Sequence, residues 1–180
     1  VLFTLGIASV GFGGMFAVFS YVMPTLTEQA GMAEALGPLV LAIFGVGTLL
    51  GTLVGARVAD WNLIRAIPLI LTWCLVVQTV FFFVADWVAP ALLFVGLVGT
   101  SIALGPAIQT RLMDVAGDAQ TMAASLNHAA FNLANALGAW LAGWVIDQGA
   151  VWSSTGLVGA ALAIGGILIF LASRRAEKRA

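Results

Sequence analysis

Residues 66–85 read AIPLILTWCLVVQTVFFFVA, twenty consecutive positions without a charged side chain. An α-helix rises about 1.5 Å per residue, so twenty residues cross roughly 30 Å, the thickness of the hydrocarbon core of a bilayer. A soluble helix of this length needs a polar stripe toward water, and this stretch has no charge with which to build one. It therefore predicts a transmembrane helix.

The rest of the chain repeats this pattern. Of its 180 residues, 62% are apolar and only 8% are charged, and the mean hydropathy is +1.09. Charge-poor runs predict six transmembrane helices, over residues 2–26, 38–59, 66–85, 89–108, 121–146 and 153–172. The expected fold is an all-α polytopic membrane protein, a six-helix bundle in a lipid bilayer with no soluble domain.

The basic residues mark one side of the membrane. All seven lie in the second connection, the fourth connection or the C-terminal tail, as Arg57, Arg65, Arg111, Arg174, Arg175, Lys178 and Arg179. The other three connections carry acids but no bases. Because positive charge collects on the cytoplasmic side, both ends of the chain are expected in the cytoplasm.

Composition argues against several functions. The net charge is −1 and the tail holds the only basic cluster, so no nucleic-acid partner is expected. Cys74 is the single cysteine, which excludes an intramolecular disulfide and a cysteine-based metal site, and no cofactor or metal is expected. Val1 enters an apolar run without the features of a signal peptide, so we expect a fragment whose natural start is missing.

The first three predicted spans resemble the last three. The second and fifth spans align with Gly51 over Gly138 and with Asp60 over Asp147. Since three is odd, matched spans cross the membrane in opposite directions. The bundle is therefore expected to be an inverted 3+3 repeat, as in secondary transporters.

Three glycines recur in the second span. Gly47, Gly51 and Gly55 stand four residues apart and share one helical face, which lets another helix approach closely. The spacing is typical of tight helix packing. It also fits a face that slides against a partner helix during transport, and the spacing alone does not separate the two.

The fifth span carries a polar stripe. Thr121, Ser125, His128, Asn132 and Asn135 follow the spacing of one helical face. Such a face is costly against lipid, so we expect it to face a water-filled cavity or another helix. In the first case Ser125, His128, Asn132 and Asn135 are solute-cavity candidates. In the second they only join helices by hydrogen bonds.

His128 is also a candidate for proton exchange, because histidine is the side chain that titrates near neutral pH. A hydrogen-bonding role is the alternative. No carboxylate lies deep in any predicted span. If protons drive this protein, the coupling acid is therefore expected in another segment.

Aromatic residues form a stripe in the first span. Phe12, Phe16 and Phe19 stand at i, i+4 and i+7, followed by Ser20 and Tyr21. Such a stripe is typical of packing or lipid contact. Facing a cavity, it suits an amphipathic solute. Phe12, Phe16, Ser20 and Tyr21 are therefore further cavity candidates.

The fourth span ends in Gly105 and Pro106, followed by Gln109 and Arg111. Proline frees a backbone carbonyl and weakens the helix, which predicts a bending point here. Gln109 and Arg111 follow this point and are candidates for gating.

Two segments, 109–118 (QTRLMDVAGD) and 126–143 (LNHAAFNLANALGAWLAG), resemble the major facilitator superfamily. Within it, the likeness is to bacterial exporters of the arabinose-efflux and chloramphenicol-efflux type. The resemblance covers essentially the whole chain, as helices seven to twelve of a twelve-helix transporter. It implies proton-coupled export of a drug or sugar across a bacterial inner membrane, with an N-terminal six-helix half as partner.

The loop at 55–65, GARVADWNLIR, resembles the weaker second copy of the family's cytoplasmic loop signature. Asp60 and Arg65 match the signature, which makes them gating candidates, whereas Trp61 and Leu63 depart from it. The resemblance also implies that the first and fourth spans border the central cavity, that the second and fifth line its sides, and that the third and sixth face lipid.

Two other classes compete with a transporter. A membrane scaffold would use every polar residue named above only to join helices. An intramembrane serine protease would pair Ser101 with His128, but residues 99–103 do not complete the G-x-S-x-G motif of a nucleophile. We expect no enzyme.

Overall fold

The computed structural model describes residues 1–177, apart from the side chains of Asp118 and Gln120. Lys178 and Arg179, two of the basic residues used to predict orientation, lie outside this range. The described chain is helical nearly throughout and contains no strand. The predicted all-α membrane fold is confirmed.

The first span is broken twice. It consists of α1 (Leu2–Gly11), α2 (Gly13–Ser20) and α3 (Val22–Pro24), and continues as one π-helical turn, Thr25–Gln29. The second break lies at Tyr21, with φ −119° and ψ 14°. Pro24 explains it, because a proline ring clashes with the carbonyl four residues earlier, here that of Ser20.

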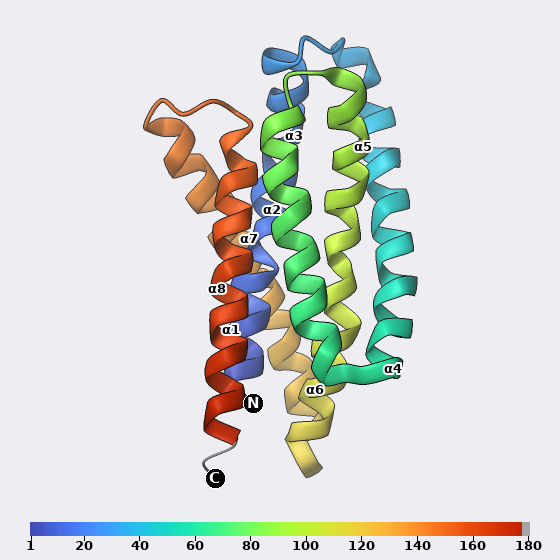
Figure 1. The fold of residues 1–180 in the computed structure, drawn as a ribbon, viewed down its shortest axis with the longest axis vertical. Helices are drawn as coiled ribbons and strands as arrows, with labels where there is room; N and C mark the ends of the chain where they lie inside the picture. Colours follow the sequence, from blue (N-terminus) through green and yellow to red (C-terminus); the bar gives the residue numbers. More distant parts are fainter. Residues whose placement is uncertain (178–180) are drawn as a thin grey trace.

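One long helix, α4 (Gly37–Val84), contains the second and third spans. Asn62 interrupts it with φ −163° and ψ 97°, and the side-chain oxygen of Asn62 accepts the backbone N–H of Arg65 at 3.0 Å. Asn62 thereby caps the start of a second helical arm. Figure 1 shows the chain reversing direction at this point, so residues 37–61 form a first arm and residues 63–84 a second.

The fourth span is longer than expected and changes its helical form. It runs through α5 (Val88–Gly99), a 3₁₀ turn (Thr100–Ala103) and α6 (Leu104–Ala116), beyond the predicted end at residue 108. Pro106 cannot donate to the carbonyl of Ile102, and its ring crowds that carbonyl. The predicted weak point thus coincides with a 3₁₀ turn just before the proline.

The last two spans are α7 (Gln120–Asp147) and α8 (Ser154–Glu177). Five continuous helical segments are long and apolar enough to cross a membrane, and one of these, Glu34–Val84, has 51 residues. At about 1.5 Å per residue it is more than twice as long as a bilayer core is thick. Its two arms therefore account for two crossings.

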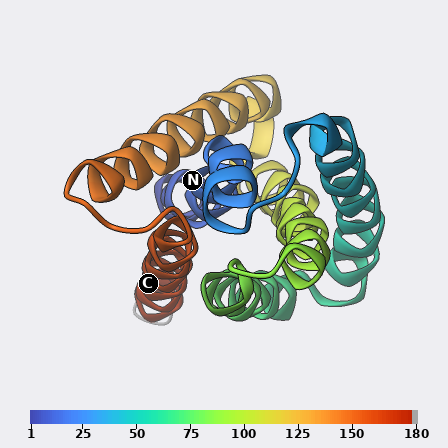
Figure 2. The ribbon, with the colours of Figure 1, turned by 90° about the horizontal axis from the view of Figure 1, so that it is seen from above.

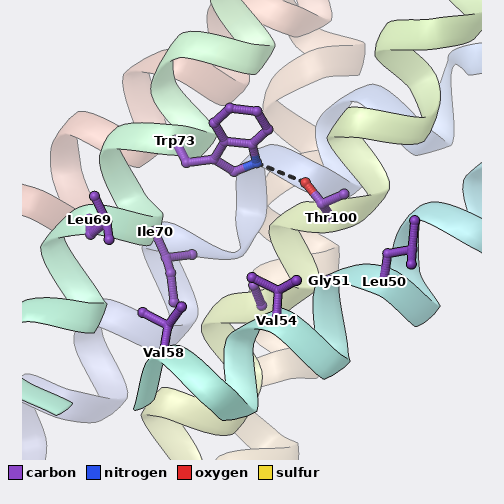
Figure 3. Close-up of a pocket in the computed structure, with 9 residues that line it drawn as sticks. Leu50, Gly51, Val54, Val58, Leu69, Ile70, Trp73 and Thr100 are labelled. Atoms are coloured by element: carbon purple, nitrogen blue, oxygen red, sulfur yellow. Dashed lines mark hydrogen bonds between the residues drawn. The ribbon is translucent and has the colours of Figure 1, made fainter. Parts of the chain in front are cut away.

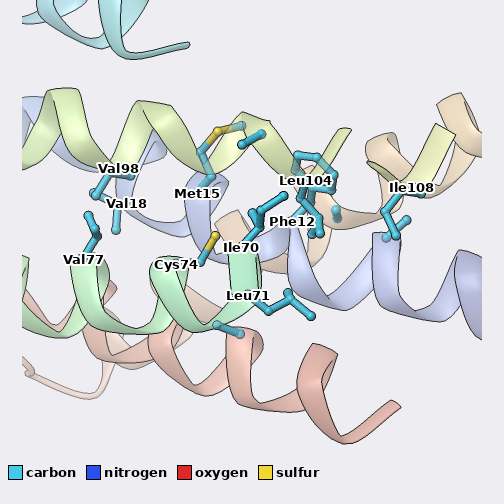
Figure 4. Close-up of a cluster of buried hydrophobic side chains, with 14 of the residues drawn as sticks. Phe12, Met15, Val18, Ile70, Leu71, Cys74, Val77, Val98, Leu104 and Ile108 are labelled. Atoms are coloured by element: carbon cyan, nitrogen blue, oxygen red, sulfur yellow. The ribbon is translucent and has the colours of Figure 1, made fainter. Parts of the chain in front are cut away.

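The first and fourth spans form the middle of the bundle. Seen from above in Figure 2, α7 lies along one edge, and α8 with the second arm of α4 lies along the opposite edge. Figure 1 shows the N-terminus, the end of α8, the turn between the arms and the end of α6 at one end of the bundle. Figure 4 shows the core between the first span, the fourth span and the second arm of α4. In this core Phe12 and Leu104 lie near Ile70 and Leu71.

Three glycines bring the first arm of α4 against the fourth span. The contacts join Gly47 to Gly96, Gly51 to Thr100 and Gly55 to Ala103. A Cβ atom at Gly51 would lie 2.6 Å from the carbonyl oxygen of Thr100, a separation that real Cβ atoms do not adopt. Burial in lipid does not itself drive helices together, so this close backbone contact contributes much of the attraction.

The other half of the bundle contains a matching contact. A Cβ atom at Gly138 of α7 would overlap the carbonyl oxygen of Gly13 and lie 3.0 Å from the backbone nitrogen of Ala17. In each case, the middle span of one triplet crosses the first span of the other triplet. α7 and the first arm of α4 are thus held in the same way.

Gln78 joins three helices at the centre of the bundle. Its side chain is fully buried, and its amide lies beside Gly14 of α2 and Gly159 of α8. Neither side-chain atom of Gln78 has a hydrogen-bond partner among the described residues. Here Gln78 packs between helices, away from any open surface.

Gly51→Ala should destabilise the bundle by about 1–3 kcal/mol, because the new methyl group meets the backbone of Thr100 rather than a flexible side chain. Gly45→Ala is the matched control on the same arm, since nothing lies within 4 Å of its Cβ position. Thermal unfolding of the intact protein in detergent measures both. Equal melting temperatures for the two variants would contradict the packing role of Gly51.

Candidate functional site

α7 has three distinct faces. One face is buried and small, and it packs on α1 and α2. Its buried residues are Ala123, Asn127, Ala130, Ala134, Gly138 and Ala142. Because these side chains are short, α7 lies close to the first span, and its remaining two faces are left on the surface of the bundle.

The second face of α7 is apolar and exposed. It consists of Met122, Leu126, Leu133, Trp140 and Trp144, which are between 39% and 66% exposed. These residues recur at i, i+4, i+11, i+18 and i+22, the spacing of one helical face. In a membrane protein such a face is suited to lipid.

The third face of α7 is polar and exposed. Thr121, Ser125, His128, Asn132 and Asn135 all lie on it, and none is buried. Among the described residues, the one side-chain hydrogen bond that this group makes stays within α7, from the Ser125 hydroxyl to the carbonyl of Thr121 at 3.1 Å. Within residues 1–177 the stripe therefore does not join α7 to another helix.

Asn127 does join two helices, and the sequence argument missed it. Its side-chain nitrogen donates to the side-chain oxygen of Gln109 at 2.6 Å, and Asn127 is 2% exposed. This bond ties α6 to α7 near one end of the bundle. Asn127 falls outside the spacing of the polar stripe. The one feature of the sequence that could have indicated its role was an amide side chain within an apolar helix.

The first-span candidates divide between core and surface. Phe12 is 1% exposed, and its ring centroid lies 4.2 Å from that of Phe131, so it packs in the core in this conformation. Phe16 and Tyr21 are half-buried, and Ser20 is exposed. The Tyr21 hydroxyl donates to the carbonyl of Ala139 at 3.3 Å, which places it against α7.

Arg111 fastens the end of α6 to the end of α8. It is 7% exposed, and Nη2 donates to Glu177 at 2.6 Å and to the Ser173 hydroxyl at 3.2 Å. Its guanidinium carbon lies 5.7 Å from the ring centroid of Phe170. This network explains why α8 extends to Glu177, five residues beyond the predicted end of the span.

Asp60 and Arg65 lie on either side of the break at Asn62, and both are exposed. Within the described range, neither side chain takes part in a salt bridge. The structure thus brings these two gating candidates to one turn. It does not bring them to Gln109 or Arg111 by any hydrogen bond or ion pair among residues 1–177.

At the other end of the bundle, one side chain ties three connections together. The Gln29 amide nitrogen donates to Asp86 at 2.6 Å and to the Ser153 hydroxyl at 3.0 Å. Its oxygen accepts the backbone N–H of Ser153 at 2.8 Å. Sequence reasoning missed this contact, because Gln29 lies 57 and 124 positions from its partners.

The proposed protease pair is not assembled. Ser101 is 3% exposed within the fourth span, whereas His128 is exposed on the polar face of α7. No hydrogen bond between described residues joins them. The described residues also contain no cluster of metal-binding side chains.

Two hollows open on the surface, and neither is lined by the polar face of α7. One has a volume of about 380 Å³ and lies between the two arms of α4 and the 3₁₀ turn (Figure 3). The other has a volume of about 570 Å³ and lies between the first arm of α4 and α5. Both are walled almost entirely by apolar side chains.

Comparison with known proteins shows which family and which relatives this chain is similar to. A family model described as Major Facilitator Superfamily matches residues 3–180. The Inner membrane transport protein YdhP of Escherichia coli (strain K12) is 30% identical over 177 residues, which are 97% of this chain and 46% of that protein.

Two further relatives agree with this match. The Chloramphenicol resistance protein of Streptomyces lividans is 30% identical over 155 residues, 83% of this chain and 40% of that protein. The MFS-type transporter YfhI of Bacillus subtilis (strain 168) is 28% identical over 180 residues, 99% of this chain and 45% of that protein. The chain thus spans a little under half the length of the curated relatives it matches.

Glu177→Gln should lower the free energy of unfolding by about 1 kcal/mol, because Arg111 loses its ionic partner while Glu177 is 45% exposed and partly screened by solvent. The difference from the parent should shrink at high salt. Arg175→Gln is the control, because Arg175 is exposed and takes part in no salt bridge among residues 1–177, and it should leave stability unchanged. Thermal unfolding at two salt concentrations measures this. A loss that is equal in both variants would contradict the role of the Arg111 network.

Proposed function

The chain belongs to the major facilitator superfamily, and we propose that it supplies one six-helix half of a secondary transporter for a small solute. The observation that carries this proposal is the polar face of α7. Ser125, His128, Asn132 and Asn135 are exposed on a helix whose neighbouring face is apolar. Polar side chains at membrane depth are costly against lipid, so this face needs water or a polar partner.

The solute pathway in this proposal lies between two six-helix halves. The polar face of α7, together with Phe16, Ser20 and Tyr21 of the first span, forms one wall. An N-terminal six-helix half supplies the other wall. The curated relatives are about twice as long as this chain, which leaves room for such a half in a protein of their length.

The two triplets of spans form an inverted 3+3 repeat in this proposal. The two crossings at Gly51 and Gly138 support it, because each joins the middle span of one triplet to the first span of the other. An inverted repeat places a solute site near the middle of the membrane, where the triplets meet. Alternating access then follows from rocking one half against the other.

The end of the bundle that holds the N-terminus and the end of α8 at Glu177 is the cytoplasmic end in this proposal. The turn with Arg57 and Arg65 lies at that end, as does the end of α6 (Figure 1). The positive-inside rule favours this orientation. The membrane is a bacterial inner membrane, as the name of the Escherichia coli relative states for that protein.

Transport in this proposal is export driven by protons. The name of the Streptomyces relative, a chloramphenicol resistance protein, supports export of a drug-like solute. His128 is the one imidazole on the polar face, and we take it as the candidate for proton exchange there. No acid lies deep in the spans predicted from the sequence, so in this proposal the coupling carboxylate belongs to the other half. Asp60 and Arg65 act at the cytoplasmic gate.

A scaffold that transports nothing is the competing class. It requires the polar residues of α7 to join helices, and within residues 1–177 Asn127 does so while the stripe beside it does not. The polar face is therefore better explained by water than by helix association.

Transport by the intact protein in lipid vesicles tests the proposal. A panel of small drugs and sugars, including chloramphenicol, is offered under an imposed proton gradient. Asn132→Leu should slow transport of the accepted solute about tenfold, the effect of losing one hydrogen bond of about 1.4 kcal/mol. Leu133→Ala, on the apolar face, is the control and should transport at the parent rate.

The outcomes of this assay separate the parts of the proposal. If no solute of the panel moves, transport itself is contradicted. If transport persists after a protonophore collapses the gradient, proton coupling is contradicted. If Asn132→Leu transports as fast as the parent, the polar face of α7 is not the pathway wall.

A further inference from the structure

An apolar groove follows the crossing of α4 and the fourth span on the surface of the bundle. It comprises the two hollows described above, which share Leu50 and Thr100. We refer to the first hollow and its lining as the α4 groove. Its lining residues are Leu50, Gly51, Val54, Val58, Leu69, Ile70, Trp73, Thr100 and Ala103.

Glycine packing creates the α4 groove. Gly51 brings the backbone of the first arm against Thr100, so no side chain fills the floor at the crossing. The neighbouring side chains stand around this floor as walls, with Val54 and Leu50 on one arm and Trp73 on the other (Figure 3). Leu50 is 52% exposed and Val54 is 54% exposed, so the walls are open to the surroundings.

The polar atoms in the groove already have partners. The indole N–H of Trp73 donates to the Thr100 hydroxyl at 2.8 Å, and that hydroxyl donates to the carbonyl of Leu97 at 2.5 Å. These two side chains offer a polar ligand no free donor and only one remaining lone pair, on the Thr100 hydroxyl, so most polar groups of such a ligand would be desolvated without compensation. The groove therefore suits a purely hydrocarbon occupant.

The α4 groove lies away from the proposed solute pathway. One of its walls is the second arm of α4, which Figure 2 shows along the opposite edge of the bundle from α7. Both arms cross the membrane, so the medium around the exposed side chains of this edge is the hydrocarbon of the bilayer.

We propose that the α4 groove binds one acyl chain of a membrane phospholipid, held between the two arms of α4 and the 3₁₀ turn of the fourth span. In hydrocarbon surroundings an empty hollow loses the dispersion contacts of the atoms that line it, and a flexible chain restores them. The occupied groove fixes the distance between the two arms. This inference depends on the membrane-spanning fold and not on the proposed transport.

Trp73 reports on the occupant, because it is 43% exposed and forms one wall. The intact protein in detergent is titrated with phosphatidylcholine whose chains carry bromine, which quenches tryptophan fluorescence on contact. The signal of Trp73 is the difference between the parent and Trp73→Phe. Quenching of Trp73 should saturate at about one lipid per protein, the stoichiometry of a single site.

Trp140 is the control for ordinary lipid contact, since it is 66% exposed on the apolar face of α7. Its quenching, measured with Trp140→Phe, should rise gradually with added lipid and show no saturation at one equivalent. Parallel curves for the two tryptophans would overturn the proposal, because the groove would then bind lipid no better than any apolar face. A Trp73 signal that is never quenched would also overturn it, since protein would then cover the groove.

A variant that fills the groove shows whether the quenching of Trp73 comes from lipid bound within the α4 groove or from lipid elsewhere around the indole ring. Val54→Phe places a ring in the hollow and should reduce the quenching of Trp73 at one lipid equivalent several-fold. Leu53→Phe, on the same arm but outside the lining, should leave the quenching unchanged. Equal quenching of Trp73 in both variants would contradict binding within the α4 groove.

Discussion

Close contact between glycine backbones is the constraint on which this bundle depends. In lipid, helices gain little from burying apolar side chains, so they associate where their backbones approach closely. Gly51 against Thr100 and Gly138 against Gly13 supply two such contacts, and each joins the middle span of one triplet to the first span of the other. The α4 groove is a consequence of the first contact, because a seam without side chains leaves a hollow beside it.

The same packing determines what α7 can do. Small residues line its buried face toward the first span, and an apolar face and a polar face lie side by side on the surface. The apolar face has a natural environment in lipid, and the polar face does not. Asn132 and its neighbours therefore need water or a polar partner beside them. In the proposed transport pathway the facing six-helix half provides that second wall.

Much of this architecture could be predicted from the sequence, because membrane spans are long and their charges lie at their ends. The span at residues 66–85 follows from its length and lack of charge, and the polar stripe of α7 follows from its helical spacing. Contacts between distant residues could not be predicted. Gln29 joins Asp86 and Ser153 across loops, and no local sequence pattern encodes the geometry of those loops. Phe12 is buried in the core, although its helical spacing groups it with Ser20, which is exposed.

In the proposed transporter the polar face of α7 faces water, while the adjacent face of the same helix faces lipid. Single cysteines placed at Asn132 and at Leu133 in the intact protein distinguish these two environments by their reaction with a water-soluble maleimide. Native Cys74 is 1% exposed and gives little background. We expect fast labelling at position 132 and little at position 133. Equal labelling at the two positions, or none at 132, would contradict it.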